Sequence, residues 1–140
     1  MENIKIRYIF ELNNSEYMKI FHIEAIENGW AEAEFKLWSQ VKERDLFIGS
    51  FDKNNNEIYV NDIIREIDWF WDKNYYHVRY KKWDFYLEQI KWLNFNWSFV
   101  YWTNWSFSKL VSEYDKKWNV ILKSVDVLWN NHNLNNLKLN

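Results

Sequence analysis

Residues 47–65 read FIGSFDKNNNEIYVNDIIR, and this stretch sets the expected fold. Apolar segments flank a polar run that extends from Asp52 to Asn56. Asp and Asn favour turns, and Asn tolerates the left-handed backbone conformation that tight turns require. We therefore expect a turn at 51–56 that leads directly into a strand at 57–67.

Alternation of apolar and polar residues continues on both sides of this stretch, and a period of two indicates strands. Residues 4–10 and 17–23 alternate in this way. A polar turn at 13–15 separates them, so the two segments predict a hairpin. Residues 41–48 predict another strand. Further strands are expected at 75–81, 84–90, 93–101 and 119–128, while 106–114 fits either a short helix or a strand.

Several short strands with turns between them predict an all-β fold with at most one short helix. The arrangement is expected to be a sandwich or pseudo-barrel of short antiparallel strands. The length of 140 residues fits a single domain over 1–140. Its end, 130–140, is rich in Asn and is expected to be a loosely packed tail.

The composition excludes several classes of site. The chain has no Cys, so it offers no disulfide, no thiolate nucleophile and no Cys-based metal site. The N-terminal residues lack the basic and then apolar regions of a signal peptide. No run of 18 apolar residues is present, so we expect no membrane span. Together these features predict a cytoplasmic protein.

Charge is unevenly distributed along the chain. The formal net charge is −2, with −6 over residues 1–70 and +4 over residues 71–140. Such asymmetry is compatible with head-to-tail self-association or with a basic face for an acidic partner, but an uneven solvated surface is the preferred interpretation. The small net charge gives no support to a general nucleic-acid binder.

The stretch 47–65 resembles the signature of the YopX family of phage and prophage proteins, typically Thr-Gly-Leu-x-Asp-x-x-Gly-x-Glu-Ile-Tyr-x-Gly-Asp-Ile-Val. The matching positions are Gly49, Asp52, Glu57, Ile58, Tyr59, Asp62 and Ile63. Residues 4–7 are similar to the family's opening Ile-Lys-Phe-Arg, and residues 125–130 to its closing Val-x-Val-Ile-Gly-Asn. The three matches follow the family's order and frame most of the chain.

This resemblance implies an all-β pseudo-barrel and a phage or prophage origin, with the host cytoplasm as the location. It supplies no activity, no cofactor and no catalytic residues. Asn55 and Asn61 stand where the family usually has Gly, which is a tolerable exchange in turns. Trp129 stands where the family has Gly, which is a less conservative exchange.

Candidate chemistry is sparse. Asp52, Asn54 and Asn56 have the spacing that opens a calcium loop, but the loop's sixth and twelfth positions carry Glu57 and Ile63 instead of Gly and Glu. A turn is therefore the preferred interpretation. Glu57 and Asp62 are five residues apart, which places them on opposite faces of a regular strand. We expect Asp52 and Asp62 to accept backbone N–H bonds in turns, with Glu57 solvated or ion-paired.

The three histidines, His22, His77 and His132, lie far apart without metal-ligand spacing. A three-His metal site stays open, but scattered histidines are more often ordinary surface or core residues. We predict no catalytic, cofactor-binding or metal residues and no enzyme activity. The expected function is a phage accessory or interaction protein whose partner is unknown: a second copy, or a host or phage protein.

Tryptophan and glycine have unusual counts, 11 and 2, with no Pro. Ordinary chains contain roughly 7% Gly. Trp stands at turn-like positions, where Gly would be natural: Trp69, Trp71, Trp83, Trp97, Trp105 and Trp118. We hypothesise that the source reads UGA as glycine and that many of these positions are Gly in the authentic protein. Trp38 is the one most readily accepted as genuine.

If the tryptophans are authentic, a second function follows. Aromatic side chains stack on bases or sugars, and neighbouring lysines attract phosphates. The residues concerned are Trp92, Trp97, Trp102 and Trp105, with Lys81, Lys82, Lys91 and Lys109. The alternative function is therefore a nucleic-acid-binding module in the C-terminal half. Aromatic residues on strands are usually core, so this ranks second.

Overall fold

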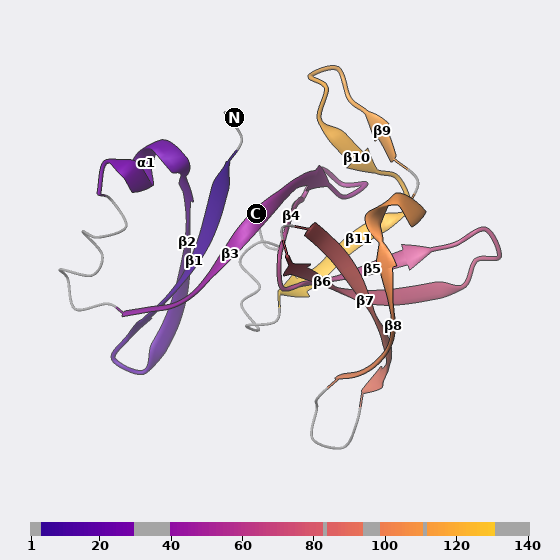
Figure 1. Cartoon of the computed structure of the whole chain (residues 1–140), viewed down its shortest axis with the longest axis horizontal. Coiled ribbons are helices and arrows are strands. Elements are labelled where there is room, and N and C mark those ends of the chain that lie inside the picture. The colour runs from indigo at the N-terminus through magenta and orange to yellow at the C-terminus, as the bar shows by residue number, and fades with distance from the viewer. Residues whose placement is uncertain (1–3, 30–39, 83, 94–98, 111, 131–140) are drawn as a thin grey trace. The chain divides into compact units, whose positions relative to one another are not determined.

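Strands dominate the structure, which confirms the predicted all-β class (Figure 1). The computed structural model describes residues 4–29, 40–82, 84–93, 99–110 and 112–130. The chain divides into two compact units, Met1–Phe47 and Ile48–Asn140. This division falls within strand β3 (Gln40–Phe51), at a point where the sequence shows no linker.

The first unit begins with the predicted hairpin. Strands β1 (Lys5–Leu12) and β2 (Ser15–His22) pair antiparallel, with Leu12 opposite Ser15. The two connecting residues, Asn13 and Asn14, have φ angles of 54° and 65°. Two-residue hairpin loops require positive φ at both positions, and Asn adopts it at low cost. The Asn-Asn pair therefore determines both the turn and the strand register.

A third strand and one short helix complete the first unit. Residues 40–46 of β3 pair antiparallel with β1. Helix α1 (Ile23–Glu27), which the sequence did not predict, follows β2 directly. The buried rings of Tyr8, Phe10 and Phe21 form the core, and α1 packs apolar side chains against it. A helix of five residues is too short to show the apolar periodicity on which prediction depends.

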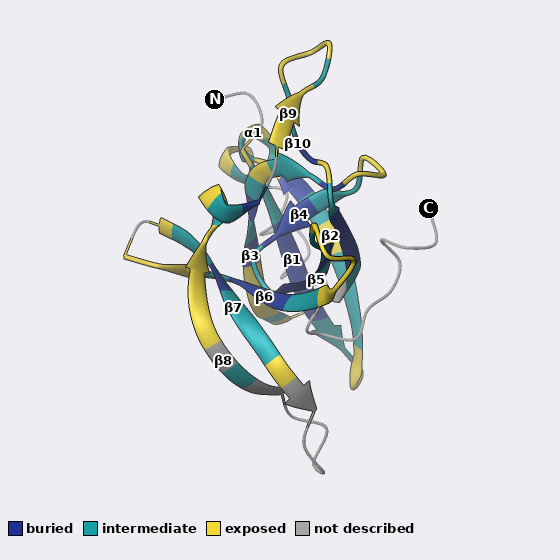
Figure 2. Ribbon diagram, turned by 90° about the vertical axis from the view of Figure 1, so that its right-hand side faces the viewer, coloured by how far each residue is buried: buried dark blue, intermediate teal, exposed yellow. Residues whose placement is uncertain are grey.

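The second unit contains a five-stranded antiparallel sheet in the order β11-β5-β6-β7-β8. The strands are β5 (Asp62–Ile67), β6 (Lys73–Lys81), β7 (Asp84–Leu93), β8 (Phe99–Ser106) and β11 (Val125–Asn130). Buried residues lie along β5 and β6, whereas the described part of β8 is mostly exposed (Figure 2). Ile64, Tyr76, Val78 and Leu87 from these strands belong to one apolar core.

Shorter elements cover the rest of the second unit. They are β4 (Glu57–Tyr59), the 3-10 helix η1 (Phe107–Lys109), β9 (Ser112–Tyr114) and β10 (Val120–Leu122). Strand β10 pairs antiparallel with β9 and parallel with the end of β3, at Ser50 and Phe51. Ile58, Leu110 and Leu122 from this part of the chain join the same core.

Two predicted strands are each divided in the structure. The segment 57–67 is two strands, because the chain turns at Asn61, whose φ is 74°. The segment 119–128 is divided into β10 and β11. The ambiguous segment 106–114 contains both alternatives, a short helix and a strand. Of the strand predicted at 93–101, residues 94–98 lie outside the described residues, as do 131–140 of the predicted tail.

Candidate functional site

Asp52, the first acidic residue of the stretch 47–65, closes a five-residue turn. Its Oδ1 atom accepts the backbone N–H groups of Asn54 and Asn56, each at 2.8 Å. Its Oδ2 atom accepts the Asn56 side-chain amide at 3.0 Å. These donors occupy the carboxylate that a calcium loop would turn toward its ion. The turn interpretation is therefore confirmed, and Asp52 accepts backbone N–H bonds as expected.

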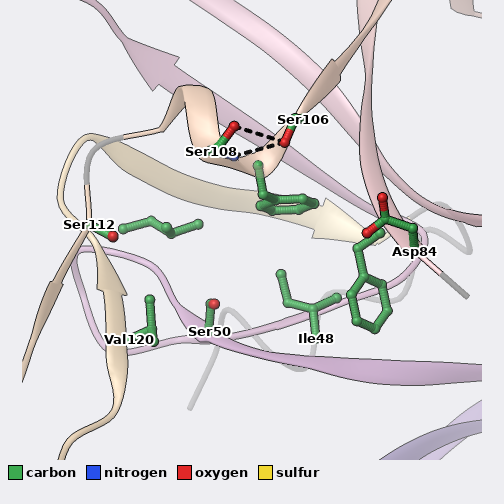
Figure 3. A pocket seen from close by; sticks show the side chains of 10 residues that line it. Ile48, Ser50, Asp84, Ser106, Ser108, Ser112 and Val120 are labelled. Carbon is green, nitrogen blue, oxygen red and sulfur yellow. Dashed lines mark hydrogen bonds between the residues drawn. The ribbon is translucent and has the colours of Figure 1, made fainter.

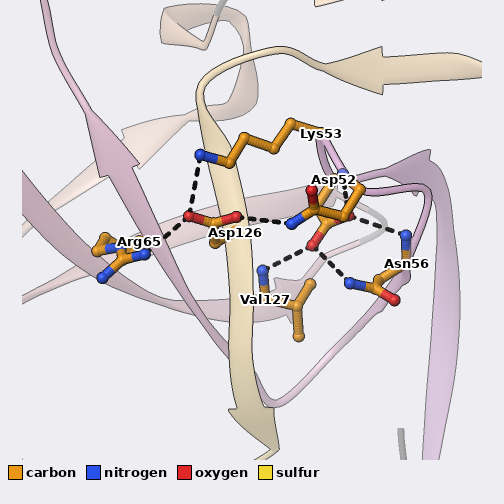
Figure 4. Close-up of polar contacts among 7 residues, drawn as sticks. Asp52, Lys53, Asn56, Arg65, Asp126 and Val127 are labelled. Atoms are coloured by element: carbon orange, nitrogen blue, oxygen red, sulfur yellow. Dashed lines mark hydrogen bonds and ion pairs between the residues drawn. The ribbon is translucent and has the colours of Figure 1, made fainter. Parts of the chain in front are cut away.

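The same turn is tied to β11 through two carboxylates (Figure 4). Asp52 Oδ2 also accepts the backbone N–H of Val127 at 2.9 Å. Asp126 accepts the side-chain amide of Asn54 at 3.0 Å and the Arg65 guanidinium at 2.9 Å. The Lys53 ammonium lies 3.4 Å from the same carboxylate. The turn, β5 and β11 thus share one polar network.

Asp126 is held ionised in this network. Burial on its own would raise the pKa of Asp126. The hydrogen bonds and charges of Arg65 and Lys53 outweigh burial and keep the pKa below its ordinary value. The sequence analysis did not single out Asp126. The sequence feature that could have identified it is an acidic residue between two valines, Val125 and Val127. In the structure both valines are buried, and Arg65 lies directly opposite Asp126 on β5.

Asp62 and Glu57 are both hydrogen-bonded to Tyr59. Asp62 Oδ2 accepts the backbone N–H of Tyr59 at 2.9 Å, as expected of a turn residue. Glu57 accepts the Tyr59 hydroxyl at 2.9 Å, whereas we had expected it to be solvated or ion-paired. The two carboxylates therefore stabilise the β4–β5 turn, which is a structural role.

The two histidines that the structure describes belong to different units. His22 is exposed at the end of β2, in the first unit. His77 is buried in β6, in the second unit, with its Nδ1 atom 2.7 Å from the Tyr101 hydroxyl. His132 lies outside the described residues. Within the ranges that the structure describes, no group of three His, Cys, Asp or Glu side chains is placed to hold a metal ion.

A pocket of about 310 Å³ lies in the second unit (Figure 3). Its polar lining consists of Ser50, Asp84, Ser106, Ser108 and Ser112. The Ser106 hydroxyl lies 2.9 Å from that of Ser108 and accepts the Ser108 backbone N–H at 3.2 Å. A serine nucleophile needs an adjacent base such as His. The lining offers serine hydroxyls and the Asp84 carboxylate, groups that can form hydrogen bonds to a small polar ligand.

A second, shallower hollow of about 430 Å³ lies beside the β5–β6 turn. Trp69 and Trp71 form part of its wall, together with Lys53 and Lys123. Both tryptophans are strongly exposed, at 86% and 83%. Aromatic rings beside lysines can bind a flat anionic ligand. The sequence analysis had placed its aromatic platform further along the chain, so it missed this hollow.

The predicted platform is described only in part. Trp97 lies outside the described residues, and Trp92 and Trp102 lie on β7 and β8 with side chains outside the described part. Trp105 is half-exposed and donates its indole N–H to Gln89 at 2.8 Å. The Lys109 ammonium lies 4.3 Å from the centroid of the Trp105 ring.

Lys109 is committed to contacts within the fold. Its ammonium lies 3.6 Å from Glu66 and 5.0 Å from the Tyr76 ring centroid. Tyr76 in turn donates its hydroxyl to Glu66 at 3.1 Å. Burial, followed by the charge and hydrogen bond of Glu66, raises the pKa of Tyr76. The other predicted lysines, Lys81, Lys82 and Lys91, are exposed on the β6–β7 hairpin.

Comparison with known family models, curated proteins and solved structures finds no match to this chain. Among the described helices, none has the length and apolar character needed to cross a membrane.

Proposed function

We propose that this chain is a non-enzymatic accessory or protein-interaction module of the YopX type, encoded by a phage or prophage and acting in the host cytoplasm. The observation that carries the proposal is the role of the acidic motif residues. Asp52, Asp62 and Glu57 each accept hydrogen bonds from the turns and strands around them. These residues serve the fold, which favours a binding role over a catalytic one.

Backbone geometry at three positions supports the YopX part of the proposal. Gly49, Asn55 and Asn61 align with glycines of the family signature. Their φ angles are 88°, 65° and 74°. Glycine is the residue best suited to positive φ, and Asn is the usual substitute. The family's glycines therefore correspond to positions where this backbone requires them. Sequencing the neighbouring genes tests the origin: we expect phage genes, and a neighbourhood of ordinary metabolic genes would contradict it.

Self-association is the partner interaction that the charge distribution favours. The two halves of the sequence carry −6 and +4. Opposite charges on one chain attract a second copy, and salt screens that attraction. We expect light scattering to show a mass above the monomer at low salt that falls as salt is added. A monomer at every protein and salt concentration would exclude self-association and leave a host or phage protein as the partner.

The hollow beside the β5–β6 turn favours the alternative function, a nucleic-acid-binding module. Lys53, Lys123 and two exposed tryptophans line it. A gel shift with single- and double-stranded DNA at low and moderate salt tests this alternative. Binding through lysines must weaken with salt, because it releases counterions from the phosphates. Absence of any shift at micromolar protein would argue strongly against it.

A further inference from the structure

Three hairpin loops of the second unit have the same five-residue structure. They are 52–56, 68–72 and 115–119, and each begins with Asp. In each loop the backbone N–H of the first residue donates to the carbonyl of the fifth, at 2.9, 3.0 and 3.0 Å. The N–H of the fourth residue donates to the carbonyl of the first, at 3.0, 3.0 and 3.1 Å.

The first side chain also has the same role in all three loops. The Oδ1 atoms of Asp52, Asp68 and Asp115 each accept the backbone N–H groups of the third and fifth loop residues. All six of these distances lie at 2.8 or 2.9 Å. The three loops can therefore be compared position by position.

The fourth position is left-handed in every loop, and its occupants differ. Asn55, Trp71 and Trp118 have φ angles of 65°, 64° and 64°. A Cβ atom is crowded by the neighbouring carbonyl in this conformation, so Gly is favoured and Asn is tolerated. A large aromatic residue at positive φ is an outlier. The loops 68–72 and 115–119 thus have Trp at a left-handed position where the loop 52–56 has Asn, which tolerates that conformation.

High exposure of the two tryptophans leaves this strain without compensation from burial. A strained residue persists when its surroundings hold it in place. Trp71 and Trp118 are instead 83% and 79% exposed. The Trp118 ring lies 5.8 Å from the Tyr114 ring between centroids, and Tyr114 is itself 65% exposed. The side chains therefore gain little burial in return for the unfavourable backbone.

We propose that positions 71 and 118 are glycine in the protein that the source organism makes, because its UGA codons are read as glycine rather than tryptophan. Asp68-Trp-Phe-Trp-Asp72 then becomes a loop with glycine at its fourth position, and Asp115-Lys-Lys-Trp-Asn119 becomes Asp-Lys-Lys-Gly-Asn. The chain's 11 Trp and 2 Gly fit this assignment. The hollow beside the β5–β6 turn then loses the Trp71 ring and keeps the Trp69 ring in its wall.

The codons and the protein itself provide the direct test. We expect UGA at positions 71 and 118 in the gene, and peptides from the protein isolated from its natural source that have the mass of glycine at both. UGG at either position overturns the proposal for that position. UGA codons together with peptides that contain tryptophan overturn it for both.

Substitutions in the full chain test the physical premise separately. Trp71→Gly and Trp118→Gly are compared with Trp71→Ala and Trp118→Ala, which remove the ring but keep the Cβ atom. We expect each Gly variant to have an unfolding equilibrium constant roughly 5- to 30-fold lower than its Ala counterpart. Equal stability of the Gly and Ala variants would remove the geometric basis of the proposal.

Two control substitutions make this comparison specific. Trp69 lies in the same loop as Trp71 and is 86% exposed, but its φ is not positive. Trp69→Gly should therefore be no more stable than Trp69→Ala, since glycine there only adds unfolded-state freedom. Asn55→Trp recreates the unsuitable residue in the third loop and should destabilise the protein. If Trp69→Gly were also more stable than Trp69→Ala, the stability gained from glycine would not depend on positive φ, and the proposal would lose its geometric basis.

Discussion

Asp52 Oδ2 accepts a hydrogen bond of 2.9 Å from the backbone N–H of Val127, 75 positions further along the chain. The same carboxylate closes the turn at 52–56 through its other oxygen. One buried side chain therefore sets the conformation of a local turn and fixes that turn against β11. Asp52 therefore makes both local and long-range hydrogen bonds in the second unit.

Replacing Asp52 with Asn should destabilise the protein. The Asn amide has one acceptor oxygen, so its NH₂ group would face two donors in either orientation. In place of Oδ1 it would face the backbone N–H groups of Asn54 and Asn56, and in place of Oδ2 it would face the Val127 N–H and the Asn56 side-chain amide. Loss of charge-assisted hydrogen bonds and a buried unpaired donor together cost about 3 kcal/mol. Urea unfolding measures this loss. Asp115→Asn is the matched control, because Asp115 heads the same kind of loop at a site that is less buried than that of Asp52. An equal loss in both variants would contradict the role of the Val127 bond.

Asp126 should make stability depend on acid pH. Its pKa is lowered in the folded state, whereas the unfolded value is about 3.9. The unfolded state therefore binds a proton first as the pH falls, and this stabilising contribution is lost as the pH falls through the folded pKa. Asp126→Asn should be less stable than wild type at pH 7, and the difference should shrink as the pH falls below the unfolded value of about 3.9. Urea titrations across this range measure it. A difference independent of pH would contradict the assignment.

Arg7 and Asp45 form a fully buried ion pair in the first unit. Arg7 lies opposite Asp45 in the β1–β3 ladder and donates to its Oδ2 atom from Nε at 3.0 Å and from Nη2 at 2.7 Å. Removing one partner leaves a buried charge, so Asp45→Asn or Arg7→Met should each cost about 3–5 kcal/mol. Chemical denaturation measures the loss. The double variant Arg7→Met/Asp45→Leu should recover much of it, and a cost equal to the sum of the single losses would contradict this account.

Tyr76 should make the protein sensitive to alkaline pH. Its pKa is raised in the folded state, while the unfolded phenol ionises at about pH 10. Above that pH the unfolded state releases a proton that the folded state keeps, so stability falls as the pH rises. Tyr76→Phe should cost about 1 kcal/mol near neutral pH through the lost Glu66 bond. The difference from wild type should then shrink above pH 10 in urea titrations, and a constant difference would contradict the raised pKa.

The parts of the structure that could be predicted depend on neighbouring residues. Alternation over 4–10 and 17–23, with the Asn pair between them, predicted the first hairpin correctly. Asp52 with Asn54 and Asn56 predicted a turn rather than a calcium loop. These features are readable because pleat periodicity and turn conformations are set within a few residues.

The boundaries of the shorter elements were harder to predict. Helix α1 and the separate strands β4 and β10 have too few residues to show a period. The sequence predicted a single domain over 1–140, and it gave no sign of the two compact units whose division falls within β3. Strand β3 pairs with β1 in the first unit and with β10 in the second. Because the division lies inside one strand, no change of composition in the sequence marks it.

By itself the sequence determined the all-β class, the local turns and the residues that cap them, because each depends on short-range sterics and hydrogen bonds. Only the tertiary structure decided which strands pair, such as β11 with β5 and β10 with β3. It alone placed Asp126 between Arg65 and Lys53, and buried Arg7 against Asp45. Those contacts join residues 38 to 73 positions apart. Such distant residues have many possible partners, and the folding of the whole chain around its cores selects among them.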